Sequence, residues 1–126
     1  MAKSNTSNEE AEIKKVNILG SEWTLKIVRD DPAFEEATGY VNDAARIIMI
    51  EAVKMKEGAL DFDLQSQYID QKRTIRHEVL HAYLYESGLA HSSNSAENWA
   101  VNEEMVDWFA RMSPKIFATY KELKVL

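Results

Sequence analysis

The sequence predicts an α+β domain, in which helices cover one face of a small, mostly antiparallel sheet of about three strands. Two observations carry this prediction. Before about residue 52, apolar residues alternate with polar ones or form a β-branched run, and both patterns are typical of strands. After about residue 64, apolar residues recur at the three- and four-residue spacing of helices.

The first predicted element is a β-hairpin. Residues 16–18 and 23–27 alternate apolar with polar side chains, which is the period of a strand with one buried face. Gly20-Ser21 lies between the two segments and supplies the turn. Two antiparallel strands are therefore expected at the start of the domain.

Two shorter elements follow the hairpin. Asp31 is placed to cap a short helix, with Pro32 at its first position and an end near Gly39. The β-branched run at residues 45–51 predicts the third strand. Residues 47–50 of this strand have two interpretations. Their backbone could form a sheet edge that pairs with an extended peptide, or the strand could be an ordinary one in the core.

The second half of the chain is predicted to be helical. A long helix runs from about residue 64 or 66 to residue 87, where Gly88 stops it as a left-handed cap. After a polar loop, Ser95 caps a second helix. Pro114 suits the first turn of a last helix, which ends near Leu123.

Length and composition limit the domain organisation and the class of function. The 126 residues contain neither a repeat nor a linker, which indicates one compact domain at residues 11–126 after a disordered polar arm at residues 1–10. Lys and Arg number 15 against 21 Asp and Glu, so the net charge is −6 and a nucleic-acid partner is disfavoured. The absence of an apolar leader or membrane span predicts a cytoplasmic protein without a membrane partner.

One helical segment carries a metal-binding pattern. The chain has no cysteine, so a metal would be held by His, Asp or Glu. His77, Glu78 and His81 form H-E-x-x-H, which places both imidazoles on one helix face and is a zinc signature. Glu78 lies beside that face and suits a general base for a water held by the metal. The alternative is two core or surface histidines beside a solvated glutamate.

A catalytic zinc usually has three protein ligands and a water, so two histidines are too few. The metzincin pattern is excluded, because Leu84 and Ser87 stand where its glycine and third histidine would be. The segment "NEEMVD", residues 102–107, instead fits the N-E-x-x-x-D pattern of the gluzincins, the thermolysin-like zinc peptidases.

Together, "HEVLHAYLYESG" and "NEEMVDWFA" resemble a minimal gluzincin, and most of all the compact ImmA/IrrE-type peptidases of bacteria and their mobile elements. This resemblance implies Zn2+ as the cofactor, with Glu103 as the third ligand after His77 and His81. It also implies that Asp107, one turn after Glu103, accepts a hydrogen bond from the distal N–H of a ligating histidine, in particular His77. Taken alone, Glu103 and Asp107 have the alternative interpretation of a solvated acidic face.

Three further side chains are candidates for stabilising a transition state. His91 lies in the polar loop after the site helix and has three interpretations: it stabilises an oxyanion, it is a fourth metal contact, or it is an ordinary loop histidine. Tyr40 and Tyr83 have the alternative role of packing aromatics. The tryptophans are all expected in the core: Trp23, Trp99 and Trp108.

The resemblance predicts a zinc-dependent endopeptidase that hydrolyses peptide bonds, with Glu78 as general base. Its partners would be a peptide or protein substrate and, as a further option, a regulatory protein. The alternative is a zinc-binding or metal-free protein-interaction module of the same fold without proteolytic activity. Glu78 favours the enzyme, because a module that only binds needs no base beside the ion.

Overall fold

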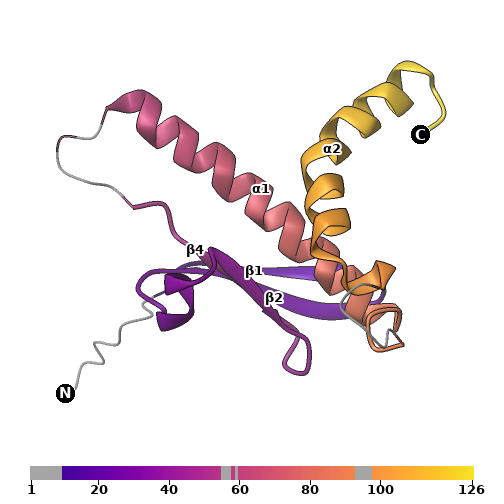
Figure 1. Cartoon of the computed structure of the whole chain (residues 1–126), viewed down its shortest axis with the longest axis horizontal. Coiled ribbons are helices and arrows are strands. Elements are labelled where there is room, and N and C mark those ends of the chain that lie inside the picture. Colours follow the sequence, from indigo (N-terminus) through magenta and orange to yellow (C-terminus); the bar gives the residue numbers. More distant parts are fainter. Residues whose placement is uncertain (1–9, 55–57, 59, 93–97) are drawn as a thin grey trace.

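The computed structural model describes residues 10–54, 58, 60–92 and 98–126. Figure 1 shows a sheet crossed by one long helix, with a second helix leaving from the end of the first. The α+β prediction is confirmed, although the sheet is mixed and has four strands instead of about three. Of the polar arm expected at residues 1–10, only Glu10 is described, and it already begins the first strand.

The sheet joins two antiparallel hairpins through a central parallel pair. Its strands are β1 (Glu10–Ile18), β2 (Ser21–Val28), β3 (Gly39–Asn42) and β4 (Ile47–Glu51). The order is β1-β2-β4-β3, in which β2 and β4 run parallel and the other two pairings are antiparallel. β4 therefore has a neighbour on each side, so the edge interpretation of residues 47–50 is wrong and β3 forms that edge.

The first hairpin is present, but its turn lies one residue earlier than predicted. Leu19 and Gly20 have φ values of 53° and 92°, and a two-residue type I′ turn requires positive φ at both positions. Ser21 pairs with Ile18 and already belongs to β2. The turn is therefore Leu19-Gly20 instead of Gly20-Ser21.

The short helix is a 3-10 helix, η1 (Pro32–Glu35). Asp31 caps it as predicted, because Asp31 Oδ1 accepts a hydrogen bond from the Ala33 N–H at 2.9 Å. The predicted end near Gly39 is too late, since Gly39 is the first residue of β3. β3 escaped prediction because four residues are too few for an alternating pattern to be visible.

The long helix α1 (Asp61–Glu86) begins slightly earlier than predicted and ends as predicted. Gly88 adopts the left-handed conformation, with φ of 89°. The Ala90 N–H then donates to the Leu84 carbonyl at 3.1 Å, which satisfies a free carbonyl of the last turn. Backbone hydrogen bonds therefore fix the end of this helix.

The last residue of α1, Glu86, ties the helix to the sheet. Its carboxylate accepts hydrogen bonds from Trp23 Nε1 at 2.8 Å, from Ser21 Oγ at 3.0 Å and from Arg46 Nε at 2.8 Å. The Arg46 guanidinium and the Trp23 indole are the main causes that lower the pKa of Glu86 from 4.5 to about 2. Glu86 is therefore held ionised among donors from β2 and the β3–β4 turn.

The second helix, α2 (Glu103–Glu122), follows a short 3-10 turn, η2 (Trp99–Val101). Asn102 caps α2, because Asn102 Oδ1 accepts a hydrogen bond from the Met105 N–H at 2.8 Å. The predicted cap, Ser95, lies outside the described residues. Along the described chain, no helix combines the length and the apolar character that a membrane crossing needs.

Pro114 lies within α2, so the prediction of a separate C-terminal helix is wrong. A proline has no N–H, so the carbonyl of Ala110, four residues earlier, loses its partner in the helix. Arg76 on α1 supplies a replacement, because its Nε donates to the Ala110 carbonyl at 2.6 Å. α2 changes direction along its length (Figure 1), as helices that contain proline do.

The main core lies between the sheet and α1. Its buried residues are Ile18, Trp23, Leu25, Ile27, Ile48, Ile50, Ala52 and Ala82. A second cluster joins the end of α1 to α2 and contains Leu84, Ala90, Ala100 and Val106. The core prediction is right for Trp23 but wrong for Trp99 and Trp108, which are 59% and 57% exposed. Trp108 points outward because Val106 and Ala110 occupy the buried face of α2.

Candidate metal centre

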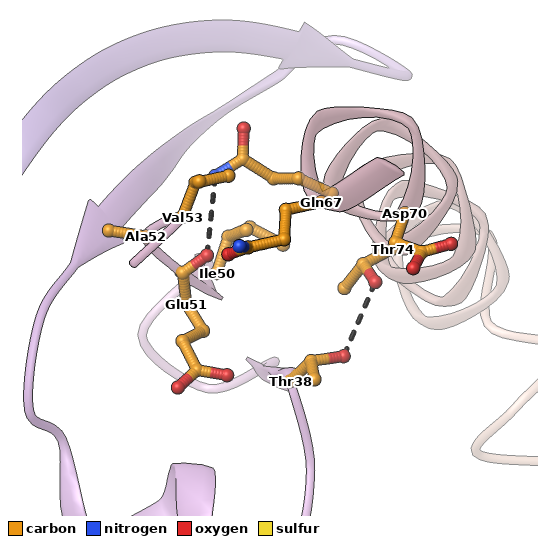
Figure 2. Close-up of a pocket in the computed structure, with 9 residues that line it drawn as sticks. Thr38, Ile50, Glu51, Ala52, Val53, Gln67, Asp70 and Thr74 are labelled. Atoms are coloured by element: carbon orange, nitrogen blue, oxygen red, sulfur yellow. Dashed lines mark hydrogen bonds between the residues drawn. The ribbon is translucent and has the colours of Figure 1, made fainter. Parts of the chain in front are cut away.

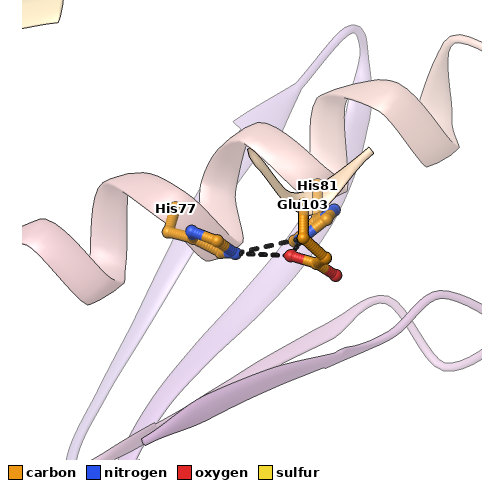
Figure 3. A group of neighbouring side chains, drawn as sticks. All are labelled: His77, His81 and Glu103. Carbon is orange, nitrogen blue, oxygen red and sulfur yellow. Dashed lines mark hydrogen bonds and ion pairs between the residues drawn. The ribbon is translucent and has the colours of Figure 1, made fainter. Parts of the chain in front are cut away.

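Three side chains from two helices meet at one point (Figure 3). His77 and His81 lie one turn apart on α1, and Glu103 is the first residue of α2. Glu103 Oε1 lies 3.0 Å from Nε2 of each histidine, and the two Nε2 atoms lie 3.2 Å apart. Within the described residues, these three side chains form a group whose ligand atoms could hold one metal ion.

Hydrogen bonds alone leave this triangle of atoms crowded. If both Nε2 atoms carry a proton, two N–H groups converge on one Glu103 oxygen while the two nitrogens lie only 3.2 Å apart. If one Nε2 is bare, its electron pair faces the carboxylate oxygen. A cation among the three atoms removes both conflicts, because each atom then directs an electron pair at the ion.

The spacing of the three atoms fits a tetrahedral zinc. Ligand atoms about 2.0–2.1 Å from zinc at tetrahedral angles lie about 3.3 Å apart, close to the 3.0 and 3.2 Å in this structure. The side chains of His77 and His81 are 18% and 11% exposed, whereas that of Glu103 is 72% exposed. The residues present therefore fit a site with two anchored rings, a carboxylate closing the open side and one position left free.

Asp107 links the His77 ring to the Arg111 guanidinium. Asp107 Oδ1 lies 3.3 Å from His77 Nδ1, the contact that the family resemblance implies, and Asp107 Oδ2 accepts a hydrogen bond from Arg111 Nε at 2.8 Å. The Arg111 guanidinium lowers the pKa of Asp107, burial opposes this, and His77 adds to the lowering. A neutral His77 that donates from Nδ1 to Asp107 has a bare Nε2, which is the tautomer that binds a metal.

Glu78 is buried between α1 and the edge strand β3. Its burial raises its pKa from 4.5 to about 7, while His77 opposes the rise and Glu103 adds to it. A Cβ at Gly39 would lie 3.0 Å from Glu78 Cγ and 2.9 Å from Thr74 Cγ2. A larger residue at this position of β3 would therefore push the Thr74 or Glu78 side chain aside.

Two cavities flank the histidines, and both contain Gly39, His77 and Glu78 in their walls. One has a volume of about 480 Å³ and includes Arg73 and Arg111, and we call it the arginine cavity. The other has a volume of about 390 Å³ and adds Tyr40, Val41, His81, Tyr85 and Glu103, and we call it the tyrosine cavity. The candidate centre is therefore open on two sides, with Glu78 at the junction.

A third cavity, of about 200 Å³, lies beside α1 (Figure 2). It shares Thr38, Asp70 and Thr74 with the arginine cavity. The hydroxyls of Thr38 and Thr74 lie 3.3 Å apart across this space. Together the cavities form a groove between α1 and the strands β3 and β4.

The candidates for transition-state stabilisation lie at different places. Tyr40 is in the wall of the tyrosine cavity, but its hydroxyl donates to Asp31 Oδ2 at 3.1 Å. Burial raises the pKa of Tyr40, and Asp31 adds to this. His91 Nε2 pairs with Asp43 at 3.0 Å and its ring centroid lies 5.3 Å from that of Tyr85, while Tyr83 is exposed. The structure thus brings Tyr40, but neither His91 nor Tyr83, to the wall of a cavity beside the ligands.

Sequence reasoning missed three residues that surround the centre: Gly39, Tyr85 and Arg111. Arg111 left a signal, because it lies four residues after Asp107 on the same helix, a spacing that favours an ion pair. Gly39 and Tyr85 left none, because their importance depends on which strand and which helix become neighbours.

Comparison with known proteins yields no relative of this chain, since no family model, curated protein or solved structure matches it.

Proposed function

We propose that this protein is a zinc-dependent endopeptidase of the gluzincin type, in which His77, His81 and Glu103 hold the metal. The observation that carries the proposal is the convergence of two separate motifs. Glu103 is 26 residues from His77 and 22 from His81 in sequence, yet its Oε1 lies 3.0 Å from each ring. The contact of Asp107 with the outer nitrogen of His77 supports the same interpretation.

The proposed chemistry divides between the metal and the chain. Zinc, when bound, supplies a Lewis acid that lowers the pKa of a water and polarises a carbonyl group. Glu78 accepts the proton of the attacking water and later delivers it to the leaving amine nitrogen. Asp107 keeps the proton of His77 on Nδ1, which leaves Nε2 free as a ligand.

Cleavage within a chain is favoured over removal of an end, because cavities lie on both sides of the ligands. A substrate can then continue past the centre in both directions. Gly39, Tyr40 and Val41 of β3 form one wall of the tyrosine cavity, and among the described strands β3 pairs only with β4. Its outer edge can accept the main chain of an extended peptide by strand addition.

The decisive experiment replaces the proposed base. Glu78→Gln should keep zinc and fold but lower peptide hydrolysis by about 100- to 10,000-fold, since an amide of nearly the same shape cannot accept the proton. Cleavage of a casein digest by the wild type and the variant would be followed by mass spectrometry, with zinc measured by elemental analysis in both.

Equal rates for the wild type and Glu78→Gln would reject Glu78 as the base. A zinc content near zero after incubation with zinc would reject the metal site itself. Bound zinc without cleavage by either protein would favour the interaction module of the same fold over the enzyme.

A further inference from the structure

The arginine cavity offers two guanidinium groups beside the candidate centre. Arg73 comes from α1 and Arg111 from α2, and both line the same cavity as His77 and Glu78. The side chains of Arg73 and Arg111 are 32% and 48% exposed, so a ligand can reach both. The tyrosine cavity on the other side of the histidines has no Lys or Arg among its lining residues. The groove is therefore chemically different on its two sides.

Each arginine uses only part of its donor capacity. Arg73 Nη1 contacts Asp70 Oδ1 at 3.1 Å, and Arg111 Nε donates to Asp107 Oδ2 at 2.8 Å. A guanidinium carries five N–H donors in a planar fork that matches a carboxylate. The two aspartates thus orient the guanidiniums, and donors remain for a further acceptor.

The remaining acidic group in the wall of this cavity is Glu78, and it lies at the junction with the tyrosine cavity. Asp70 and Asp107 are each paired with one arginine, so these four side chains carry no net charge together, and the attraction for an acceptor comes from the guanidinium N–H groups that remain. An incoming carboxylate would therefore meet two oriented guanidiniums and no unpaired aspartate of the cavity wall. A chain with a net charge of −6 would otherwise repel such a group.

The position of Arg73 on α1 determines how far from the scissile bond its ligand can lie. Arg73 precedes His77 by one helical turn, about 6 Å. An extended peptide advances about 3.3 Å per residue, so this distance corresponds to about two substrate residues. We propose that the arginine cavity binds an acidic side chain of the substrate, within two residues of the scissile bond, and that Arg73 and Arg111 determine this specificity. The inference rests on the proposed peptidase function, because it describes part of its substrate.

The test measures peptide binding in the absence of cleavage. Zinc-loaded Glu78→Gln protein would be immobilised and offered matched pools of random octapeptides, with either Glu or Gln fixed at one position. Mass spectrometry would quantify the retained peptides for each fixed position. We expect retention about fivefold higher for Glu than for Gln at one or two neighbouring positions, the size typical of partly exposed ion pairs.

The arginines are then removed in the same background. Arg73→Gln and Arg111→Gln should each reduce the preference for Glu, and the double variant should abolish it. Lys72→Gln is the matched control, because Lys72 is an exposed neighbour on α1 that lines none of the three cavities. Zinc content and circular dichroism would be measured for every variant, since Arg111 also contacts Asp107.

The outcomes separate this inference from the proposed function. Equal retention of Glu and Gln pools, retention of neither, or a preference that survives loss of both arginines would overturn the specificity. If the wild type cleaves peptides without this preference, the specificity alone is wrong. If the preference and its loss are observed but the wild type cleaves nothing, the cavity binds acidic peptides and the peptidase proposal fails instead.

Discussion

The Asp107 carboxylate joins two neighbours at the candidate centre, the His77 ring on α1 and the Arg111 guanidinium on its own helix. Such a carboxylate orients a ligating ring and increases its basicity. Its two oxygens are divided between the two partners, so Arg111 fixes the carboxylate while Oδ1 faces His77. The orientation of one ligand thus depends on a side chain that does not touch the metal position.

Replacing Asp107 with alanine should weaken zinc binding by about 10- to 100-fold, as the loss of such outer partners typically does. The measurement is a competition titration of zinc against a chromogenic chelator. Asp70→Ala is the matched control, because Asp70 lines the same cavity and contacts Arg73, not His77. Identical zinc affinities for the wild type and Asp107→Ala would show that Asp107 is an ordinary surface charge.

The ligand candidates could be predicted from sequence because helical periodicity alone places His77 beside His81 and Glu103 beside Asp107. That the two pairs meet depends on how two helices cross, and for this the sequence offered only a family resemblance. Glu86 could not be predicted at all as a tether, since its partner Trp23 is 63 residues away. Local spacing therefore predicted the pairs, and long-range contacts decided their surroundings.

Among the elements, one hydrogen bond between α1 and α2 is made possible by a missing backbone donor. Pro114 leaves the Ala110 carbonyl without its helical partner, and Arg76 of α1 donates to it at 2.6 Å. Ala110 is buried, so an unsatisfied carbonyl there would cost about 1–3 kcal/mol. Arg76 thus offsets a defect in the neighbouring helix.

Arg76→Met should destabilise the wild type by about 1–2 kcal/mol, and by less in a Pro114→Ala background. Alanine restores an N–H that can serve the Ala110 carbonyl, so Arg76 is then no longer needed for it. Urea unfolding of the two single variants and the double variant gives the coupling free energy. Arg73→Met is the control and should show no coupling to Pro114. An equal cost of Arg76→Met in both backgrounds would contradict this account.

The helix and strand predictions differ in outcome for a physical reason. α1 was predicted nearly to its ends, because a long periodic pattern and the left-handed Gly88 mark it. β3 was missed and Pro114 was misinterpreted, since a four-residue strand is specified by its pairing with β4 and a proline inside a helix is tolerated only when another group compensates. Neither the pairing partner of β3 nor the group that compensates for Pro114 can be recognised from the neighbouring residues in the sequence.

Across the whole molecule, Glu86 joins the end of α1 to the sheet through Ser21, Trp23 and Arg46. Its pKa is lowered from 4.5 to about 2 in the folded chain. A carboxyl group whose pKa is lowered by folding stabilises the folded chain at a pH above its pKa in the unfolded chain. This contribution is lost as the pH falls through its pKa in the folded chain. The affected window therefore runs from about pH 5 downward to about pH 2.

Glu86→Gln should consequently reduce stability at pH 6, and the difference from the wild type should shrink as the pH falls toward 3. The reason is that Glu86 takes up a proton in the unfolded chain at a higher pH than in the folded chain, so a falling pH favours unfolding of the wild type but not of Glu86→Gln. Urea midpoints at pH 6, 4.5 and 3 would measure this, with the exposed Glu36→Gln as control. A difference that stays constant over this range would contradict the assignment of Glu86.

The three proposed ligands belong to two helices, with His77 and His81 on α1 and Glu103 on α2. A metal ion held by all three would connect the helices as a cross-link that the chain itself does not contain. By mass action, an ion that binds only the folded chain adds about 1.4 kcal/mol of stability for each tenfold rise in its free concentration above the dissociation constant.

The thermal unfolding midpoint should therefore rise with buffered free zinc in the wild type. In Glu103→Gln, which keeps both histidines but loses the carboxylate from α2, the rise should be much smaller. A midpoint that is independent of zinc would mean that the folded chain does not bind the ion at these concentrations. If the dependence is observed, the fraction of the protein that is folded near its unfolding temperature would vary with the zinc concentration around it.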